Sequence, residues 1–204
     1  MRRYHAAFPE SSKRAMPIVR LADCPARPWK NGHGRTRELL VHPAGAAMGD
    51  FLWRVSVAEV ESAAPFSAFP GVDRVIALLA GDGFAMTMDD GTRHELTAPC
   101  EPYAFPGEMG VAVALAGGPS RDFNLMLRRG RARGRIEVWR AAGEHRLGTD
   151  VVLVCCARGA FDCAAGTVRA DECWLPDGDR LVLAAGAVAL AVRVEELAAP
   201  PMRA

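Results

Sequence analysis

The feature that most constrains the fold is a long internal repeat. The segment RVIALLAGDGF, residues 74–84, is echoed by DVVLVCCARGAF at residues 150–161. The segment CEPYAFPGEMGVAVAL, residues 100–115, is echoed by DECWLPDGDRLVLAAGAVALAV at residues 171–192. Each half contains a strand, a glycine turn, a hairpin, a stretch with an aromatic residue and proline, and two more strands. Such self-similarity indicates two copies of one structural unit.

The segments of each unit have the pattern of β-strands. In FLWRVSVAEV, residues 51–60, large apolar residues alternate with a face that carries Arg54 and Ser56. Asp90-Gly91 marks the turn of a hairpin. No segment keeps a helical period, so we expect little helix. Short strands with evenly spaced turns, present twice, predict an all-β fold of two barrels packed side by side.

The chain has 204 residues, which suffices for two small β-domains with buried cores. We expect a flexible N-terminal arm without hydrophobic period over residues 1–16 and an arginine-rich linker over residues 128–135. The first barrel should span residues 17–127 and the second, smaller barrel residues 136–204.

Charge and cysteine content restrict the partners and the compartment. The net charge of +1 gives no global field that would attract nucleic acid or an anionic membrane. The longest apolar run, residues 181–192, is too short to span a bilayer as a helix. The six cysteines form no CxxC pair, and residues 1–16 lack the apolar core of a signal peptide. We therefore expect free thiols and a cytoplasmic protein.

Five ordered blocks resemble a known family: WKNGHGRTREL, FLWRVSVAEVES, FSAFPGVDRVIALLAG, YAFPGE and DFNLM. Together they are similar to the HutD/Ves family of bacterial proteins, over about residues 17 to 195. The resemblance implies a bicupin, in which the cupin jelly roll occurs twice. It also implies a frequent genetic link to histidine breakdown, and it implies no established reaction.

The usual metal site of cupins is not expected in this chain. If Gly81 is the closing glycine of the first motif of typical metal-binding cupins, the glutamate position falls on Arg74. The two histidine positions fall on Ser67 and Phe69, or on Ala68 and Pro70. A guanidinium repels a divalent cation, which needs several converging donors. We expect no metal and no cofactor.

Arg74 would instead favour an anion. Arginine matches a carboxylate with two parallel hydrogen bonds. The candidate ligand-binding residues on the neighbouring strands, loops and opening block are Lys30, Asn31, Thr36, Arg37, Arg54, Ser56, Ser67, Arg74 and Asn124. The alternative for each arginine is an ion pair with Glu38, Asp73 or Asp122, and the tryptophans Trp29 and Trp53 are expected in the core.

The main functional hypothesis is a metal-free bicupin that binds a small carboxylate metabolite, such as urocanate or formylglutamate, in a regulatory or sensor role. The alternative is a metal-independent isomerase or lyase with Glu38 or Asp122 as general base. Nucleic-acid contact through the arginines of residues 128–135 is not expected, because no aromatic residues interleave them. An apolar sheet face in the second barrel predicts a homodimer.

Overall fold

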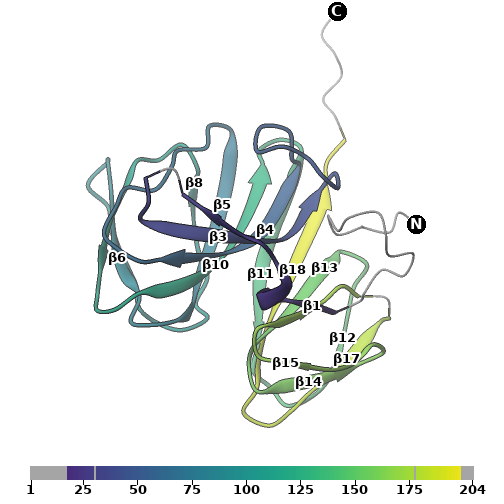
Figure 1. Cartoon of the computed structure of the whole chain (residues 1–204). Coiled ribbons are helices and arrows are strands. Elements are labelled where there is room, and N and C mark those ends of the chain that lie inside the picture. The colour runs from purple at the N-terminus through teal and green to yellow at the C-terminus, as the bar shows by residue number, and fades with distance from the viewer. Residues whose placement is uncertain (1–17, 30, 177, 199–204) are drawn as a thin grey trace, which may run out of the picture.

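A computed structural model describes residues 18–29, 31–176 and 178–198 of the chain. It shows two β-barrels side by side, the first at the left of Figure 1 and the second at the lower right. The described residues contain no α-helix, only one 3-10 turn, η1 (Leu21–Asp23). The prediction of an all-β fold of two barrels is confirmed. Within the described ranges, no helix has the length and apolar character needed to cross a membrane. The expected arm, residues 1–16, lies outside the described residues.

Each barrel consists of a large and a small sheet. The first has a six-stranded sheet in the spatial order β2 (Ala26–Pro28), β3 (Gly34–His42), β4 (Trp53–Val60), β10 (Ser120–Arg128), β5 (Val72–Ala80), β8 (Tyr103–Pro106), and a three-stranded sheet, β7 (Arg93–Leu96), β6 (Phe84–Met88), β9 (Val111–Leu115). The second has a five-stranded sheet, β1 (Ile18–Arg20), β16 (Glu172–Trp174), β13 (Val151–Arg158), β18 (Val188–Glu196), β11 (Ala132–Trp139), and a four-stranded sheet, β12 (Gly143–Arg146), β17 (Arg180–Leu183), β14 (Ala160–Cys163), β15 (Gly166–Arg169).

The internal repeat is visible in the strand pairing. In the first barrel β5 pairs with β8 and β10, while β6 pairs with β7 and β9. In the second barrel β13 pairs with β16 and β18, while β14 pairs with β15 and β17. The turns after β5 and β13 both use glycine at positive φ, Gly83 at 78° and Gly159 at 73°. The two echoed halves of the sequence therefore fold into the same arrangement.

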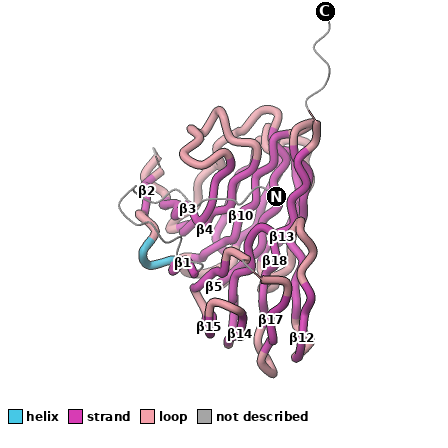
Figure 2. Tube along the Cα trace, turned by 90° about the vertical axis from the view of Figure 1, so that its right-hand side faces the viewer, coloured by secondary structure: helices cyan, strands magenta, loops and turns pink. Residues whose placement is uncertain are grey.

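The described chain begins in the second barrel and then enters the first. Strand β1 forms the edge of the five-stranded sheet by pairing with β16, with Val19 opposite Cys173. Figure 2 shows the turn η1, in cyan, between β1 and β2. Within the segment expected as a linker, Ala132 to Arg135 belong to strand β11. A short N-terminal segment thus ties the second barrel to the first.

The two large sheets face each other and share a hydrophobic core. The first barrel contributes Trp53, Phe123 and Leu125, and the second contributes Leu153 and Leu190, all completely buried in one cluster. Trp53 is therefore a core residue, as expected. Strands β13 and β18 are the most apolar segments of the second barrel, and one face of each packs in this shared core. The second barrel buries a face of the first.

Few large apolar side chains remain exposed outside this contact. Among the described residues, the exposed large hydrophobic side chains are Met48 and Val182. They come from different barrels and do not form the apolar sheet face on which the expected homodimer was based. The homodimer stays a prediction.

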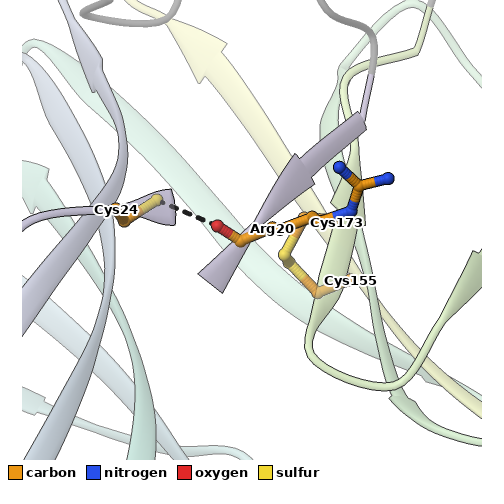
Figure 3. The surroundings of a disulfide bond; sticks show 4 residues. All are labelled: Arg20, Cys24, Cys155 and Cys173. Carbon is orange, nitrogen blue, oxygen red and sulfur yellow. Dashed lines mark hydrogen bonds between the residues drawn. A yellow bond between two sulfur atoms is a disulfide. The ribbon is translucent and has the colours of Figure 1, made fainter. Parts of the chain in front are cut away.

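One pair of cysteines corrects the expectation of free thiols. Cys155 on β13 and Cys173 on β16 lie opposite each other and form a disulfide. Figure 3 shows this bond beside Arg20 of β1, whose carbonyl oxygen accepts a hydrogen bond of 3.5 Å from the Cys24 thiol. The prediction was wrong here because spacing along the chain does not reveal which cysteines antiparallel pairing brings together. The cytoplasmic expectation loses the support that it drew from free thiols.

This pairing predicts a definite labelling pattern. Iodoacetamide added to the unfolded, unreduced protein should modify Cys24, Cys100, Cys156 and Cys163, and should leave Cys155 and Cys173 unmodified. Because the bond closes a loop with a sequence separation of 18 residues, reducing it should lower the free energy of unfolding by about 3 kcal/mol. Peptide mass spectrometry and denaturant titration measure the two effects. Alkylation at all six positions without reductant would contradict the pairing.

The arginines near residues 128–135 are largely matched by carboxylates. Arg129 binds Asp73 and Glu108, Arg133 binds Glu195, and Arg135 binds Glu137. Paired surface charges of this kind give little net positive potential. The expectation that this segment does not bind nucleic acid stays a prediction.

Candidate functional site

The candidate site lies on the inner face of the six-stranded sheet of the first barrel. Alternation along β4, β5 and β10 separates two sets of side chains. One set, with Trp53 and Phe123, packs against the second barrel. The other set faces the three-stranded sheet and includes Ile76 and Leu78, which pack against Phe84. The inner set also carries the buried polar side chains of the barrel.

The strand register brings these polar side chains together. Asn124 on β10 lies opposite Ser56 on β4, and Met126 lies opposite both Arg54 on β4 and Arg74 on β5. Asp122 precedes Asn124 by two residues on β10, so its side chain lies on the same face. Residues directly opposite each other in an antiparallel sheet point to the same side. Four of the predicted residues, Arg54, Ser56, Arg74 and Asn124, therefore share one surface.

Arg74 is the most deeply buried cation of this surface. Arg74 is only 5% exposed, and three phenylalanine rings surround its guanidinium. The guanidinium carbon lies 5.2, 5.6 and 4.9 Å from the ring centroids of Phe66, Phe69 and Phe105. Burial lowers the pKa of Arg74 to about 10, so it stays protonated at neutral pH. The Nε–H of Arg74 has no hydrogen-bond partner among the described protein groups.

Arg54, by contrast, is already paired. Its Nε donates a hydrogen bond of 2.7 Å to Glu38 on β3, and its Nη1 donates one of 3.3 Å to the Ser56 hydroxyl. The ion pair anticipated as an alternative thus holds for Arg54. Because Glu38 balances Arg54, this pair adds little net charge to the site.

Asp122 is the acidic residue of the site whose carboxylate forms no ion pair or hydrogen bond with a described side chain. Its side chain is almost completely buried, and neither carboxylate oxygen has a hydrogen-bond partner among the described groups. Burial raises the pKa of Asp122 to about 7, although the positive charge of Arg74 acts in the opposite direction. The amide oxygen of Asn124 is also buried without a partner in this part of the chain. The site thus combines one donor and three acceptor atoms that are not satisfied by described protein groups.

The loop between β4 and β5, residues 61–71, covers the site. It supplies Phe66 and Phe69, whose backbone N–H groups donate to Val111 and Gly107 across the barrel opening, at 2.9 and 2.7 Å. Phe66 also meets the ring of Trp29 edge to face, with 6.2 Å between ring centroids. The two rings pack over the Arg74 guanidinium and shield it from solvent.

Other predicted residues lie away from the cluster. Arg37 points to the opposite side of β3, where it binds Glu59 and the carbonyl oxygen of Cys24, because it alternates with the inward Thr36 and Glu38. Ser67 is exposed in the loop. Asn31 is exposed and accepts a hydrogen bond from the His33 amide in a turn. Arg37, Ser67 and Asn31 were predicted to bind the ligand, but their side chains do not join the polar cluster. Lys30, another predicted residue of the opening block, lies outside the described residues.

Thr36 lies at the rim of the cluster. Its hydroxyl accepts a hydrogen bond of 2.8 Å from the indole Nε1 of Trp29, and it lies in register with Ala58. The strand register shifts between Glu38 and Leu40, and beyond this point Leu40 packs in the core that the two barrels share. The opening block WKNGHGRTREL is therefore a turn followed by a strand whose inner residues reach the site.

Sequence reasoning missed the aromatic enclosure of Arg74. None of the three rings, Phe66, Phe69 and Phe105, is among the predicted ligand-binding residues. The signal was the recurrence of Phe-Pro-Gly in both segments, residues 69–71 and 105–107. The pairing of β5 with β8, with Arg74 opposite Phe105, brings the two segments together.

The residues present do not fit the metal of the cupin fold. Arg74 occupies the inner face where the resemblance placed a glutamate ligand, and Phe69 contributes a ring rather than a donor. Among the described residues, no group of three or more His, Cys, Asp or Glu side chains is arranged to hold a metal ion. The expectation of a site without metal stays a prediction.

Solved structures share this architecture. HutD from Pseudomonas fluorescens SBW25, solved in a formate condition, is 30% identical with a TM-score of 0.75, over 89% of this chain and 98% of that chain. A conserved protein of unknown function from Pseudomonas aeruginosa PAO1 is 31% identical with a TM-score of 0.72, over 87% of this chain and 97% of that chain. A cupin 2 conserved barrel domain protein from Leptotrichia buccalis, 8% identical with a TM-score of 0.57, shows the fold alone.

Sequence relatives agree over part of their length. A protein from the hutC 3' region of Pseudomonas putida is 38% identical over 60% of this chain, and protein Ves from Cronobacter sakazakii is 40% identical over 56%. The chain spans 63% and 61% of these two relatives. The profile of the HutD family matches residues 21–199, which include both barrels and every polar residue of the site. With this match across the two barrels, the chain belongs to the HutD family.

Proposed function

We propose that the first barrel binds a small carboxylate metabolite without a metal, and that the chain acts as a sensor or regulator linked to histidine utilisation. The single observation that carries the proposal is the environment of Arg74. A buried guanidinium that lacks a protein partner for its Nε–H is costly unless another group satisfies it. A ligand carboxylate would satisfy the nitrogen and offset the charge together.

The surroundings of Arg74 favour a flat, conjugated or short ligand. Three phenylalanine rings enclose the guanidinium and exclude water, which strengthens a charged hydrogen bond. Arg54 is held by Glu38, so Arg74 remains the cation with an unsatisfied donor on this surface. About ten ligand heavy atoms, at roughly 0.8 kcal/mol each, would give micromolar affinity.

The genetic context of a relative suggests which carboxylates to test. The Pseudomonas putida relative is named for its position in the hutC 3' region. Urocanate and formylglutamate are small carboxylates of histidine breakdown. We take them as the first candidate ligands.

Isothermal titration calorimetry with each compound tests this function. The wild type should bind one of them with micromolar affinity, and Arg74→Met should weaken binding by about 10- to 150-fold, the range for loss of a charged hydrogen bond. Arg133→Met, at an exposed arginine of the second barrel, is the matched control and should bind like the wild type. Equal affinity of Arg74→Met and the wild type would rule out this site.

A metal-independent isomerase or lyase is the second candidate function. Burial raises the pKa of Asp122 to about 7, where a general base is effective at neutral pH. Glu38, the other candidate base, is held by Arg54 at 2.7 Å. Conversion of a candidate carboxylate by chelator-treated protein, lost in Asp122→Asn, would support this function. Binding without any product would count against it.

A further inference from the structure

The acceptor atoms of β10 outnumber the donors available to them. Both carboxylate oxygens of Asp122 and the amide oxygen of Asn124 are buried without a partner among the described groups. The two residues are neighbours on one face of one strand, about 7 Å apart along it. Facing strands do not supply donors: Ile76 and Leu78 lie beside them on β5, and Ala58 lies opposite Asp122 on β4.

The opposite sheet offers no donor either. Its inward side chains near the site are apolar, namely Phe84, Met86, Leu96, Val111 and Val113. The Ser56 hydroxyl, opposite Asn124, accepts from Arg54, and the Asn124 amide oxygen has no hydrogen-bond partner among the described groups. The charged groups that face Asp122 are Arg74 on β5 and, farther along β4, Arg54 with its partner Glu38. No hydrogen bond from another described residue reaches the Asp122 carboxylate, so its oxygens are available to accept from a ligand N–H group.

We propose that Asp122 is a specificity-determining residue, which selects carboxylates that also carry an N–H donor. This rests on the proposed function: Arg74 takes the carboxylate, and Asp122, assisted by Asn124, accepts from an N–H group at the other end of the ligand. The side chain of Arg74 and the two positions of β10 span an elongated surface, which suits a ligand with its carboxylate and its N–H group at opposite ends.

The physical basis is the asymmetry of buried hydrogen bonds. A ligand without the N–H group leaves a desolvated carboxylate unsatisfied, and it gains nothing in return. A site that is built to accept from a donor discriminates strongly against an analogue that lacks only that donor. A ligand with the N–H group satisfies both polar ends of the site and leaves the aromatic enclosure unchanged.

A pair of ligands of nearly equal shape tests the inference. Urocanate has an imidazole N–H, and 3-(3-furyl)acrylate replaces the ring by a furan that has no N–H. N-formylglutamate and its N-methyl derivative form a second pair that differs at the amide N–H. In calorimetry the wild type should prefer the N–H member of the binding pair by about 10- to 150-fold.

The variants identify Asp122 as the residue responsible. Asp122→Leu keeps the branching at Cγ in a larger side chain but removes both acceptors, so the preference should fall to within about threefold. Asp122→Asn keeps one acceptor oxygen and should retain part of the preference. Asp162→Asn, at an exposed aspartate of the second barrel, is the control and should keep the full preference. A native far-ultraviolet spectrum establishes that each variant is folded, and if Asp122→Leu does not fold, Asp122→Asn carries the comparison.

The outcomes separate this inference from the proposed function. If the wild type binds both members of a pair equally, or if the preference survives in both Asp122 variants, the inference is overturned while carboxylate binding stands. If the wild type binds no member of either pair, carboxylate binding itself fails, and the inference fails with it. A preference that disappears with Asp122 supports both.

Discussion

Replacing Asp122 by asparagine should stabilise the protein, and the gain should grow as the pH rises. We expect the free energy of unfolding to increase by roughly 2 kcal/mol at pH 5 and by roughly 4 kcal/mol at pH 8. The reason is that burial raises the pKa of Asp122 from an ordinary 3.8 to about 7, with the positive charge of Arg74 offsetting only part of the effect. Asparagine has the same shape and no charge to desolvate.

The direction follows from proton binding. Between pH 4 and pH 7 the folded protein holds a proton on Asp122 that the unfolded chain has released. The folded state binds more protons in this window, so its stability falls as the pH rises through it. Above pH 7 both states are ionised and the loss is constant. Asp122→Asn removes this contribution, and the curves of the two proteins diverge between pH 4 and pH 7.

Urea titrations of both proteins from pH 4 to pH 9 measure the effect. Asp162→Asn, at an exposed aspartate of the second barrel, is the control variant in these titrations. A constant difference between Asp122→Asn and the wild type across this range would show that Asp122 is not desolvated in the folded protein. Such stabilisation by loss of a polar group is typical of residues retained for function.

Replacing Phe123 by alanine should have a comparably large effect of the opposite sign. Phe123 is completely buried in the cluster that joins the two large sheets. Removing a buried phenylalanine side chain costs about 3–5 kcal/mol, because apolar contacts are lost and a cavity remains. Since this core belongs to both barrels, the whole chain should still unfold in one transition, at a lower urea concentration.

Two spectroscopic probes test whether the barrels unfold together. Tryptophan fluorescence reports on Trp29 and Trp53 of the first barrel and on Trp139 and Trp174 of the second, and far-ultraviolet circular dichroism reports on all strands. The two transitions should coincide for the wild type and for Phe123→Ala. Separate transitions, with the second barrel unchanged by the substitution, would mean that the shared core does not couple the barrels.

Much of the fold could be predicted because the repeat and the alternation report on strands directly. FLWRVSVAEV placed Trp53 on one face of β4 and Arg54 on the other, and both assignments hold. The crossing of β1 to the second barrel was not foreseen, since three residues carry too little pattern to name their partner. The disulfide was missed for a related reason, because it depends on the pairing of β13 with β16.

The site was predictable only where position along a strand decides the direction of a side chain. Arg74, Arg54, Ser56 and Asn124 share one face because their strands pair in that register. Arg37 was assigned to the site although it alternates with inward residues of β3, and a one-residue difference reverses the side of a sheet. Ser67 and Asn31 lie in loops, whose course the pattern does not determine.

The most direct test of the account is a crystal structure of the protein grown with urocanate or formylglutamate. The account predicts density for the ligand inside the first barrel, with its carboxylate within hydrogen-bond distance of Arg74 and its N–H group directed to Asp122. A transition-metal ion at this position, confirmed by its anomalous signal, would contradict the central claim. So would a ligand that binds elsewhere while Arg74 keeps only its phenylalanine neighbours.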